Sequence, residues 1–246
     1  MKKERLDRVL LDKGLAASRE RARALIMEGK VLVGGAAVTK AGSMVEESAS
    51  ITLKEPDIPY VSRGGLKLEA AAERFGIDFA GKTAMDVGAS TGGFTDLMLK
   101  RGARRVYAID VGYGQFDWRL RQDPRVVLFE KTNIRHLERD AIPEDIDIAT
   151  VDVSFISLKL VIPKVMEFLR PGGEIAALIK PQFEAGRLEV GKGGIVRDEA
   201  ARLRAVESVR EAMRELGLEE LGVMESPIKG QKGNIEYLIY LRKRAD

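Results

Sequence analysis

Residues 84–94 read AMDVGASTGGF, and they give the clearest indication of the fold of most of the chain. An apolar run that ends at Val87 predicts a β-strand, and a helix is expected to begin at Phe94. The turn between them holds three glycines, Gly88, Gly92 and Gly93. Glycine tolerates positive φ and lets a ligand approach the backbone closely, and a helix N-terminus leaves unpaired N–H groups at the same point. The stretch therefore predicts a strand–turn–helix unit that binds a nucleotide-like ligand.

Two aspartates at strand ends indicate which ligand the turn binds. The turn lacks the spacing of a dinucleotide fingerprint, and Asp86 would repel a pyrophosphate. S-adenosylmethionine instead offers a sulfonium, an ammonium and a ribose, and Asp110, at the end of the next expected strand, is placed to bond the ribose hydroxyls. The alternative is an ordinary strand–helix turn without a ligand. The residues expected to bind this cofactor are Asp86, Gly88, Ala89, Ser90, Thr91, Gly92, Gly93, Phe94 and Asp110.

From residue 82 onward the chain alternates between strands and helices. Apolar runs predict strands at residues 82–87, 104–111, 126–130, 146–153 and 173–180, and periodicity predicts helices near 93–101, 115–121, 157–169 and 198–216. Such alternation indicates an α/β fold with a doubly wound, mostly parallel sheet. Two further strands, 218–226 and 234–242, follow with no helix between them. This ending resembles class I S-adenosylmethionine-dependent methyltransferases, whose seven-stranded sheet has an antiparallel last strand between its neighbours.

The positive charge of the chain is concentrated at its N-terminus. The formal net charge is +3, but residues 1–30 hold nine Lys/Arg against five Asp/Glu, so the remaining residues carry a net charge of −1. Two short helices are expected in this segment, and Ser18 is a suitable cap for the second. Arg19 and Arg23 lie four residues apart on the exposed face of that helix. Such a face indicates either a polyanion-binding surface or an ordinary solvated surface.

The segment of residues 5–35, RLDRVLLDKGLAASRERARALIMEGKVLVGG, continues from these helices into a β-hairpin. The spacing of its Arg-Leu-Asp, Ser-Arg and Ala-x-x-Leu-Ile-x-x-Gly-x-Val-x-Val-x-Gly motifs resembles that of the S4 RNA-binding domain, with Gly34 where the family often has Asn. The resemblance implies that the basic helix face holds RNA phosphates, which gives affinity rather than sequence reading. The residues it assigns to RNA are Arg5, Arg19, Arg23 and Lys30. We expect an α+β S4-like domain at residues 1–56, a linker at 57–62 and a methyltransferase domain at 63–246.

Composition excludes several other kinds of site. The chain has no cysteine, so disulfides and cysteine-based zinc sites are excluded, and its single histidine, His136, cannot form a metal site alone. No apolar run reaches the length of a transmembrane helix, and the start, MKKERLDRVL, lacks the apolar region of a signal peptide. We therefore expect a cytoplasmic protein without a metal ion or a membrane partner, and we infer no obligate protein partner.

Four charged residues lie where burial would be costly without a function. Lys67 is in the helix expected from residue 63, and Asp152 ends the fourth strand. Lys180 ends the fifth strand, and Glu236 is expected inside the last one. Ligands of open α/β sheets bind at the carboxyl ends of parallel strands, and an antiparallel last strand begins at that same edge. The four side chains are therefore expected to converge, and ordinary ion pairs at strand ends are the alternative.

Together these four residues resemble the Lys-Asp-Lys-Glu tetrad of the FtsJ-like ribose 2′-O-methyltransferases. Two flanking motifs agree, SRGGLKL at residues 62–68 and KPQF at 180–183. An S4 domain before an FtsJ-like domain is the arrangement of the TlyA (haemolysin A) family of rRNA methyltransferases, and the resemblance covers essentially the whole chain. It implies methyl transfer to a ribose 2′-hydroxyl of ribosomal RNA, with a cytidine as target and rRNA or ribosomal subunits as partner.

The tetrad suits that reaction chemically. A ribose 2′-hydroxyl must lose its proton during attack, whereas a lysine in water titrates near ~10.4, and burial together with a second cation favours the neutral amine. We expect Lys180 to act as general base or to stabilise the developing alkoxide, and Lys67 to position the 2′-oxygen. Asp152 and Glu236 are expected to orient and partly neutralise the lysines. The sequence leaves open which lysine is the base.

After Lys180, residues 184–197 form a loop with four glycines and three cations, Arg187, Lys192 and Arg197. A long glycine-rich loop beside a site is usually functional or disordered. We predict that this loop is mobile and orders over RNA, and a flexible connector is the alternative.

Other functions stay open at this point. A non-catalytic RNA- or ribosome-binding protein would keep the same fold, although the intact tetrad argues against it. A membrane-lytic protein, which the haemolysin name invites, would need an apolar membrane-inserting face, and no strongly apolar amphipathic helix is found. S4 domains also accompany pseudouridine synthases, but here the C-terminal part carries a methyl-donor turn.

Overall fold

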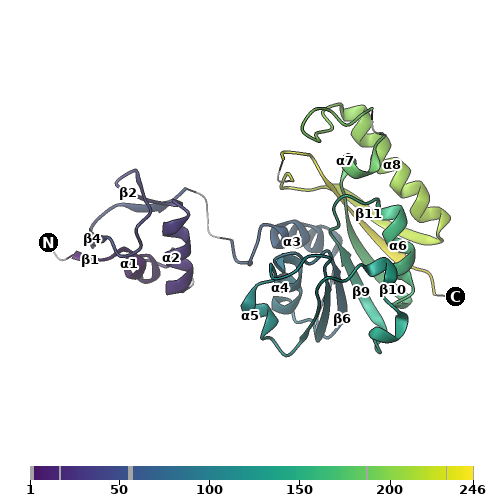
Figure 1. The fold of residues 1–246 in the computed structure, drawn as a ribbon, viewed down its shortest axis with the longest axis horizontal. Coiled ribbons are helices and arrows are strands. Elements are labelled where there is room, and N and C mark those ends of the chain that lie inside the picture. Colours follow the sequence, from purple (N-terminus) through teal and green to yellow (C-terminus); the bar gives the residue numbers. More distant parts are fainter. Residues whose placement is uncertain (1–2, 17, 55–57, 187, 231, 246) are drawn as a thin grey trace. The chain divides into compact units, whose positions relative to one another are not determined.

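The computed structural model describes residues 3–16, 18–54, 58–186, 188–230 and 232–245. It divides into two compact units, Met1–Pro59 and Tyr60–Asp246 (Figure 1). The division falls inside the expected linker, while the expected boundary at residue 56 lies outside the described residues. Tyr60 is buried in the second unit, and the backbone N–H of Val61 donates to Asp96 there (2.9 Å). Within the described residues, no helix has the length and apolar character needed to cross a membrane.

The first unit packs two helices, α1 (Leu6–Asp12) and α2 (Arg19–Met27), beside short strands. The strands are β1 (Lys3–Arg5), β2 (Val31–Val33), β3 (Ala36–Val38), β4 (Met44–Glu46) and β5 (Ile51–Leu53). β2 lies between β3 and β5 and is antiparallel to both, and β1 pairs with β4. Ser18 caps α2 as predicted, because its hydroxyl accepts the N–H of Arg21 (3.1 Å). β1 and β4 were not predicted, since three residues give too little alternation to detect.

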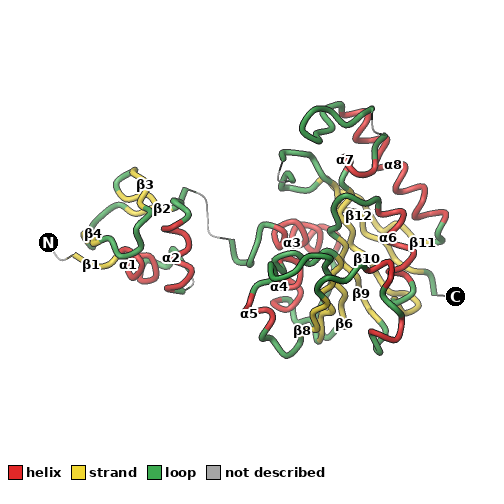
Figure 2. Tube along the Cα trace, viewed as in Figure 1, coloured by secondary structure: helices red, strands yellow, loops and turns green. Residues whose placement is uncertain are grey.

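The second unit is built on one seven-stranded sheet with the order β11-β12-β10-β9-β6-β7-β8 (Figure 2). Its strands are β6 (Thr83–Val87), β7 (Arg105–Ile109), β8 (Val126–Phe129), β9 (Ile146–Val151), β10 (Leu169–Ile179), β11 (Leu218–Glu225) and β12 (Tyr237–Lys243). β12 runs antiparallel to both of its neighbours, whereas β6 to β10 are parallel where they pair. The predicted class I methyltransferase sheet, with its antiparallel last strand between two neighbours, is confirmed.

Helices cover both faces of this sheet. They are α3 (Gly64–Phe75), α4 (Gly93–Lys100), α5 (Trp118–Arg121), α6 (Leu158–Met166), α7 (Pro181–Glu184) and α8 (Glu199–Glu215), with 3₁₀ turns η1 (Ile134–His136) and η2 (Arg139–Ala141). Alternate residues of β6 enter two cores: Ala84 packs with α3 and α4, and Met85 packs with α6 and α8. Because strand side chains alternate between faces, one short apolar strand anchors both helical layers.

Four predicted boundaries near the site were wrong. β10 begins at Leu169, not 173, because Leu169 pairs with Ile146 of β9 before a bulge; α6 accordingly ends at Met166. The helix predicted at residues 115–121 covers only Trp118–Arg121, the helix α5. Glu236 is not inside the last strand but directly before β12, because the neighbouring strand β10 ends before Lys180 and offers no further pairing. After Lys180 the chain enters α7, a helix that was not predicted.

Candidate active site

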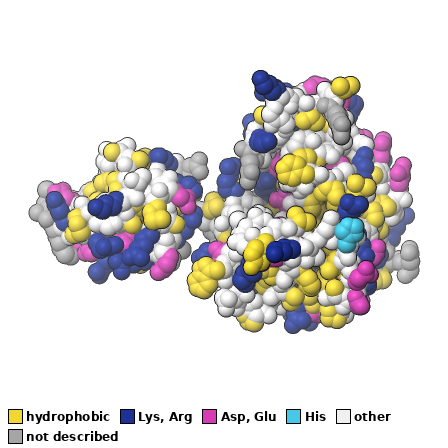
Figure 3. All heavy atoms as spheres, viewed as in Figure 1, with side chains coloured by type: hydrophobic (Ala, Val, Ile, Leu, Met, Phe, Trp, Pro, Cys, Tyr) yellow, Lys and Arg dark blue, Asp and Glu magenta, His cyan; other side chains and the backbone are white. Residues whose placement is uncertain are grey.

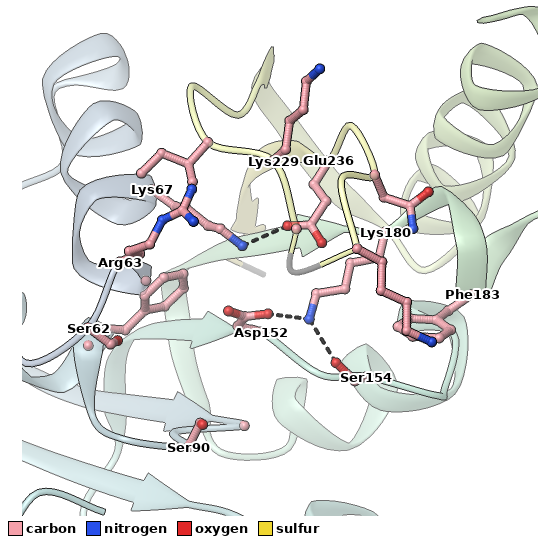
Figure 4. A pocket seen from close by; sticks show the side chains of 18 of the residues that line it. Ser62, Arg63, Lys67, Ser90, Asp152, Ser154, Lys180, Phe183, Lys229 and Glu236 are labelled. Carbon is pink, nitrogen blue, oxygen red and sulfur yellow. Dashed lines mark hydrogen bonds and ion pairs between the residues drawn. The ribbon is translucent and has the colours of Figure 1, made fainter. Parts of the chain in front are cut away.

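A cavity of about 700 Å³ opens at the carboxyl edge of the parallel strands (Figure 4). Its walls come from α3, from the turn after β6, from the ends of β9 and β10 and from the segment before β12. A second cavity, of about 460 Å³, shares Gly88, Ser90 and Asp152 with it and extends to the end of β7. In this protein, cavities therefore lie at the edge of the sheet where open α/β folds bind their ligands.

The glycine turn is shaped by two contacts that only glycine permits. Gly88 has φ +83°, and a Cβ there would lie 2.4 Å from the backbone oxygen of Asp152. Gly92 has φ +95°, and a Cβ there would lie 2.5 Å from Leu120. The turn thus lies directly against the end of β9 and against α5. The predicted turn residues that line the first cavity are Gly88, Ala89, Ser90, Thr91, Gly93 and Phe94; Gly92 packs beneath them.

Asp110 follows β7 and lines the second cavity. One carboxylate oxygen accepts the backbone N–H of Ser90 (2.7 Å), and the other accepts the N–H of Gly112 (2.6 Å) and the side-chain amide of Gln115 (3.1 Å). Asp110 therefore ties the end of β7 to the glycine turn. Its predicted contact with ribose hydroxyls stays a prediction.

Asp86 lies beneath the turn with no exposed surface. The hydroxyls of Thr95 and Thr150 donate to its carboxylate at 2.6 and 3.2 Å. Burial raises the pKa of Asp86 from 3.8 to about 7, and the two threonine hydrogen bonds oppose this rise. Asp86 lines the cavity, but its hydrogen bonds serve the packing of β6 against α4 and β9.

We expect the second unit to lose stability relative to an Asp86→Asn variant as the pH rises from about 4 to 7. A carboxyl whose folded pKa is raised contributes stability that is fully present below its unfolded pKa, 3.8, and is lost as the pH passes the folded value of about 7. Between these values the difference should change by about 1.4 kcal/mol per pH unit. Urea unfolding followed by the fluorescence of Trp118, the only tryptophan, measures it; curves with the same pH dependence for both proteins would count against the raised pKa.

The four predicted catalytic residues converge as two lysine–carboxylate pairs. Lys67 Nζ donates to Glu236 at 2.7 Å, and Lys180 Nζ lies 2.6 Å from Asp152 (Figure 4). The register brings two of them together. Ile179 of β10 lies opposite Tyr237 of the antiparallel β12, so Lys180, which follows Ile179, and Glu236, which precedes Tyr237, come side by side. Lys67, Lys180 and Glu236 are buried in the unit. Such buried pairs are costly to desolvate, which indicates that the site serves chemistry rather than stability.

Two buried acceptors in the cavity wall differ in how well they are satisfied within the described residues. Among these residues Oε1 of Gln182 has no partner, and Oδ1 of Asp152 has only its ion pair with Lys180 (2.6 Å). An unsatisfied buried acceptor is costly, so a ligand with N–H or O–H donors fits this wall. The ammonium of S-adenosylmethionine and a ribose hydroxyl are donors of this kind.

Ser154 and Phe155 were missed by the sequence analysis. The Ser154 hydroxyl accepts from Lys180 Nζ (2.9 Å). Phe155 is 89% exposed, has a positive φ of 65° and contacts the Phe183 ring, with 5.1 Å between centroids. A bulky residue at positive φ is strained, and strain of this kind collects at functional sites. The only sequence signal was an aromatic residue directly after the strand-ending Asp152-Val153-Ser154.

Glu184 was also missed. Its carboxylate accepts the Ser157 hydroxyl (2.5 Å) and the N–H of Leu158 (2.7 Å), so it ties α7 to the start of α6. Burial raises the pKa of Glu184. The tie holds together the two segments that carry Phe155 and Phe183.

The glycine-rich loop, residues 184–197, is hydrogen-bonded to Asn234 near its C-terminal end. The Asn234 side chain donates to the backbone oxygen of Gly194 (2.8 Å) and accepts the N–H of Val196 (3.1 Å). Val190 and Gly194 line the cavity, whereas Arg187 lies outside the described residues. The predicted mobility of the loop, and its ordering over RNA, stay predictions.

In the first unit, three of the four residues predicted to bind RNA meet at one carboxylate. Arg5, Arg19 and Arg23 all pair with Asp7. Lys30 does not join them and pairs with Glu28 instead (2.7 Å). Of the four residues predicted to bind RNA, Lys30 is therefore not part of the cluster around Asp7.

Comparison with known proteins agrees with both units. Residues 60–243 match the family described as FtsJ-like methyltransferase, and residues 4–51 match the S4 domain. The chain is 44% identical over 246 residues to the protein named 16S/23S rRNA (cytidine-2′-O)-methyltransferase TlyA of Mycobacterium tuberculosis, covering all of this chain and 92% of that one. It is 42% identical to Hemolysin A of Brachyspira hyodysenteriae, over 96% of this chain and 98% of that protein.

A solved structure points the same way. A protein of Streptococcus thermophilus named as a candidate hemolysin superimposes with a TM-score of 0.77 at 43% identity, covering 99% of this chain and 90% of that one. The chain therefore belongs to the TlyA family, in which an S4 domain precedes an FtsJ-like methyltransferase domain with S-adenosylmethionine as its cofactor.

Proposed function

We propose that the protein transfers a methyl group from S-adenosylmethionine to the 2′-oxygen of a cytidine ribose in ribosomal RNA. The observation that carries the proposal is the pair of lysine–carboxylate contacts facing one cavity beside the glycine turn. The relative from Mycobacterium tuberculosis is named for this reaction on 16S and 23S rRNA. A ribosomal substrate would place the enzyme in the cytoplasm.

The cofactor is held, in this proposal, by the turn that follows β6 and by Asp110 at the end of β7. When bound, S-adenosylmethionine supplies an electrophilic methyl group on a sulfonium that is a good leaving group. The unsatisfied Oε1 of Gln182 offers an acceptor for its ammonium or for the substrate ribose. The protein's own tasks are then to align the 2′-hydroxyl and to manage its proton.

Lys180 is the residue we assign to the 2′-oxygen. Its Nζ faces Asp152 and Ser154, and because a lysine ammonium has three hydrogens, one direction stays available for a ribose oxygen. From that position the ammonium holds the oxygen as negative charge develops; alternatively the neutral amine, which has a lone pair in place of the third hydrogen, takes the hydroxyl proton. Lys67, anchored on Glu236, approaches from α3 and positions the oxygen.

The exposed Phe155 and the half-buried Phe183 offer an aromatic surface for the target base. Phe155 and Phe183 line the same cavity as the two lysines. Stacking of a base on an aromatic ring contributes about 1–3 kcal/mol, and a base must leave its helix before its ribose can enter such a cavity. We therefore assign Phe155 to stacking on the cytosine.

In this proposal the two units have different roles. The S4-like domain, which we place at residues 1–56, holds ribosomal RNA through Arg5, Arg19 and Arg23, while residues 63–246 carry out methyl transfer. Phosphate contacts by arginine are independent of sequence, so the choice of nucleotide falls to the second unit and to the shape of the RNA.

Incubation of the protein with tritiated S-adenosylmethionine and ribosomal subunits tests the function. We expect label in rRNA, resistance of the labelled site to alkaline cleavage, and a mapped position at a cytidine ribose. Free 16S and 23S rRNA tested in parallel distinguish naked RNA from assembled subunits. An absence of label in every substrate, with cofactor binding intact, would leave a non-catalytic RNA-binding protein as the better description.

A further inference from the structure

A buried carboxylate holds the arginines of the first unit together. Asp7 lies in the first turn of α1, and its side chain has no exposed surface. It accepts hydrogen bonds from Nε and Nη2 of Arg5 (3.0 and 2.9 Å). It also accepts from Nε of Arg19 (3.2 Å) and from Nε of Arg23 (3.1 Å). Three guanidinium groups, from β1 and α2, therefore share one anion.

The cluster keeps an excess of positive charge at the surface. The side chains of Arg5, Arg19 and Arg23 are 41%, 47% and 50% exposed, and three cations against one anion leave a net charge of +2. The hydrogen bond from Arg5 holds the pKa of Asp7 far below its usual range, so the carboxylate stays ionised at any working pH. Lys and Arg side chains form one broad patch over the helices of this unit (Figure 3).

The hydrogen bonds leave the outer donors of two arginines available. A guanidinium carries five N–H donors in a planar fork, and Arg19 and Arg23 each give only Nε to Asp7. Their amino groups have no other acceptor within the described residues. Pairs of such donors bind a phosphate bidentately. A lysine lacks this planar fork, so its ammonium cannot offer a phosphate two parallel N–H donors while it bonds Asp7.

We propose that Asp7 is a positioning residue that gathers Arg5, Arg19 and Arg23 into one phosphate-binding fork for RNA. The inference rests on the proposed function, because it assumes that this face binds RNA. Without the carboxylate, three like charges repel one another and spread into solvent, and ordering them again would be a cost of binding. Removing a negative charge at Asp7 should therefore weaken the binding of a polyanion, which is the opposite of the effect expected from charge alone.

The test compares Asp7→Asn with Asp12→Asn in the full-length protein. Both remove one negative charge from α1, but Asp12 is exposed and only approaches Arg8, at 3.9 Å. We expect Asp7→Asn to bind 16S and 23S rRNA about tenfold more weakly, the effect of losing one charged hydrogen bond, with a salt dependence shallower by about one unit. Asp12→Asn should bind equally or more tightly. Tighter binding by both variants, with a steeper salt dependence, overturns the proposal.

A second pair of variants covers the case in which Asp7→Asn unfolds the first unit, which circular dichroism would reveal. Arg23→Lys keeps the charge but lacks the planar fork that gives a phosphate two donors while a third bonds Asp7, so we expect about a tenfold loss of RNA affinity. Arg8→Lys on the exposed face of α1 should leave affinity unchanged. Equal affinities of Arg23→Lys and the wild type overturn the proposal.

The outcome for the wild type separates this inference from the proposed function. If the wild type methylates rRNA and the Asp7 and Arg23 variants bind it normally, only the positioning role is wrong. If the wild type neither binds nor methylates rRNA, both proposals are wrong.

Discussion

Lys180→Ala should lower methyl transfer to rRNA by about 10³-fold, within the range observed for positioned proton-transfer groups. The nitrogen that we assign to the 2′-oxygen is then missing, whereas the glycine turn and Asp110 are untouched. The affinity for S-adenosylmethionine should therefore stay close to that of the wild type. Single-turnover methyl transfer and calorimetric cofactor titration measure the two effects separately.

The variant also leaves the Asp152 carboxylate without its cation, and an unpaired buried charge destabilises a protein. The double variant Asp152→Asn/Lys180→Ala removes that charge and should recover stability without recovering activity. Lys164→Ala on α6, where the lysine pairs with the nearby Glu167 and lies over the Phe168 ring, is the matched control and should remain active. Near-normal turnover by the double variant would show that Lys180 is not the residue that handles the hydroxyl.

Gly88→Ala should weaken cofactor binding by about 10²-fold. An added Cβ would lie 2.4 Å from the backbone oxygen of Asp152, which cannot move without displacing the end of β9. The turn must then shift by a fraction of an ångström or more, and displacements of about 1 Å in such sites can cost about 10²-fold. Equilibrium binding of S-adenosylmethionine measures the effect.

Gly102→Ala supplies the control for backbone strain. Gly102 has φ +86°, close to the +83° of Gly88, but the nearest atom to an added Cβ there is 3.5 Å away. Both variants carry the cost of placing alanine at positive φ, about 1–2 kcal/mol, and only Gly88→Ala adds a clash at the site. If the two variants bind the cofactor equally well, the close approach of the turn to β9 is not needed for cofactor binding.

Much of the fold could be predicted from local sequence. Apolar runs separated by glycine turns and amphipathic helices indicate a parallel α/β sheet, because their periods reflect which faces are buried. The two final strands without a helix between them indicate the antiparallel ending that β11 and β12 show. The Arg-Leu-Asp and Ser-Arg motifs likewise indicate the first unit, whose α2 cap formed at Ser18.

Boundaries next to the site were less predictable, because tertiary contacts set them. β10 extends back to Leu169 through pairing with β9, and β12 starts after Glu236, not before it. Phe155 carried no periodic signal, since its positive φ and exposure come from the turn that follows β9. Local propensity contains none of these constraints.

The residues of the site can be listed from the sequence alone: a glycine turn for the cofactor, two lysines, two carboxylates and a basic N-terminal helix. Which of these residues pair with one another depends on the tertiary structure. Lys67 meets Glu236 across 169 residues of sequence, Lys180 meets Asp152, and Asp7 collects three arginines from two elements. The physical reason is that partners across a sheet follow from strand order and register, which depend on the packing of the whole unit and leave no trace in the spacing of single residues.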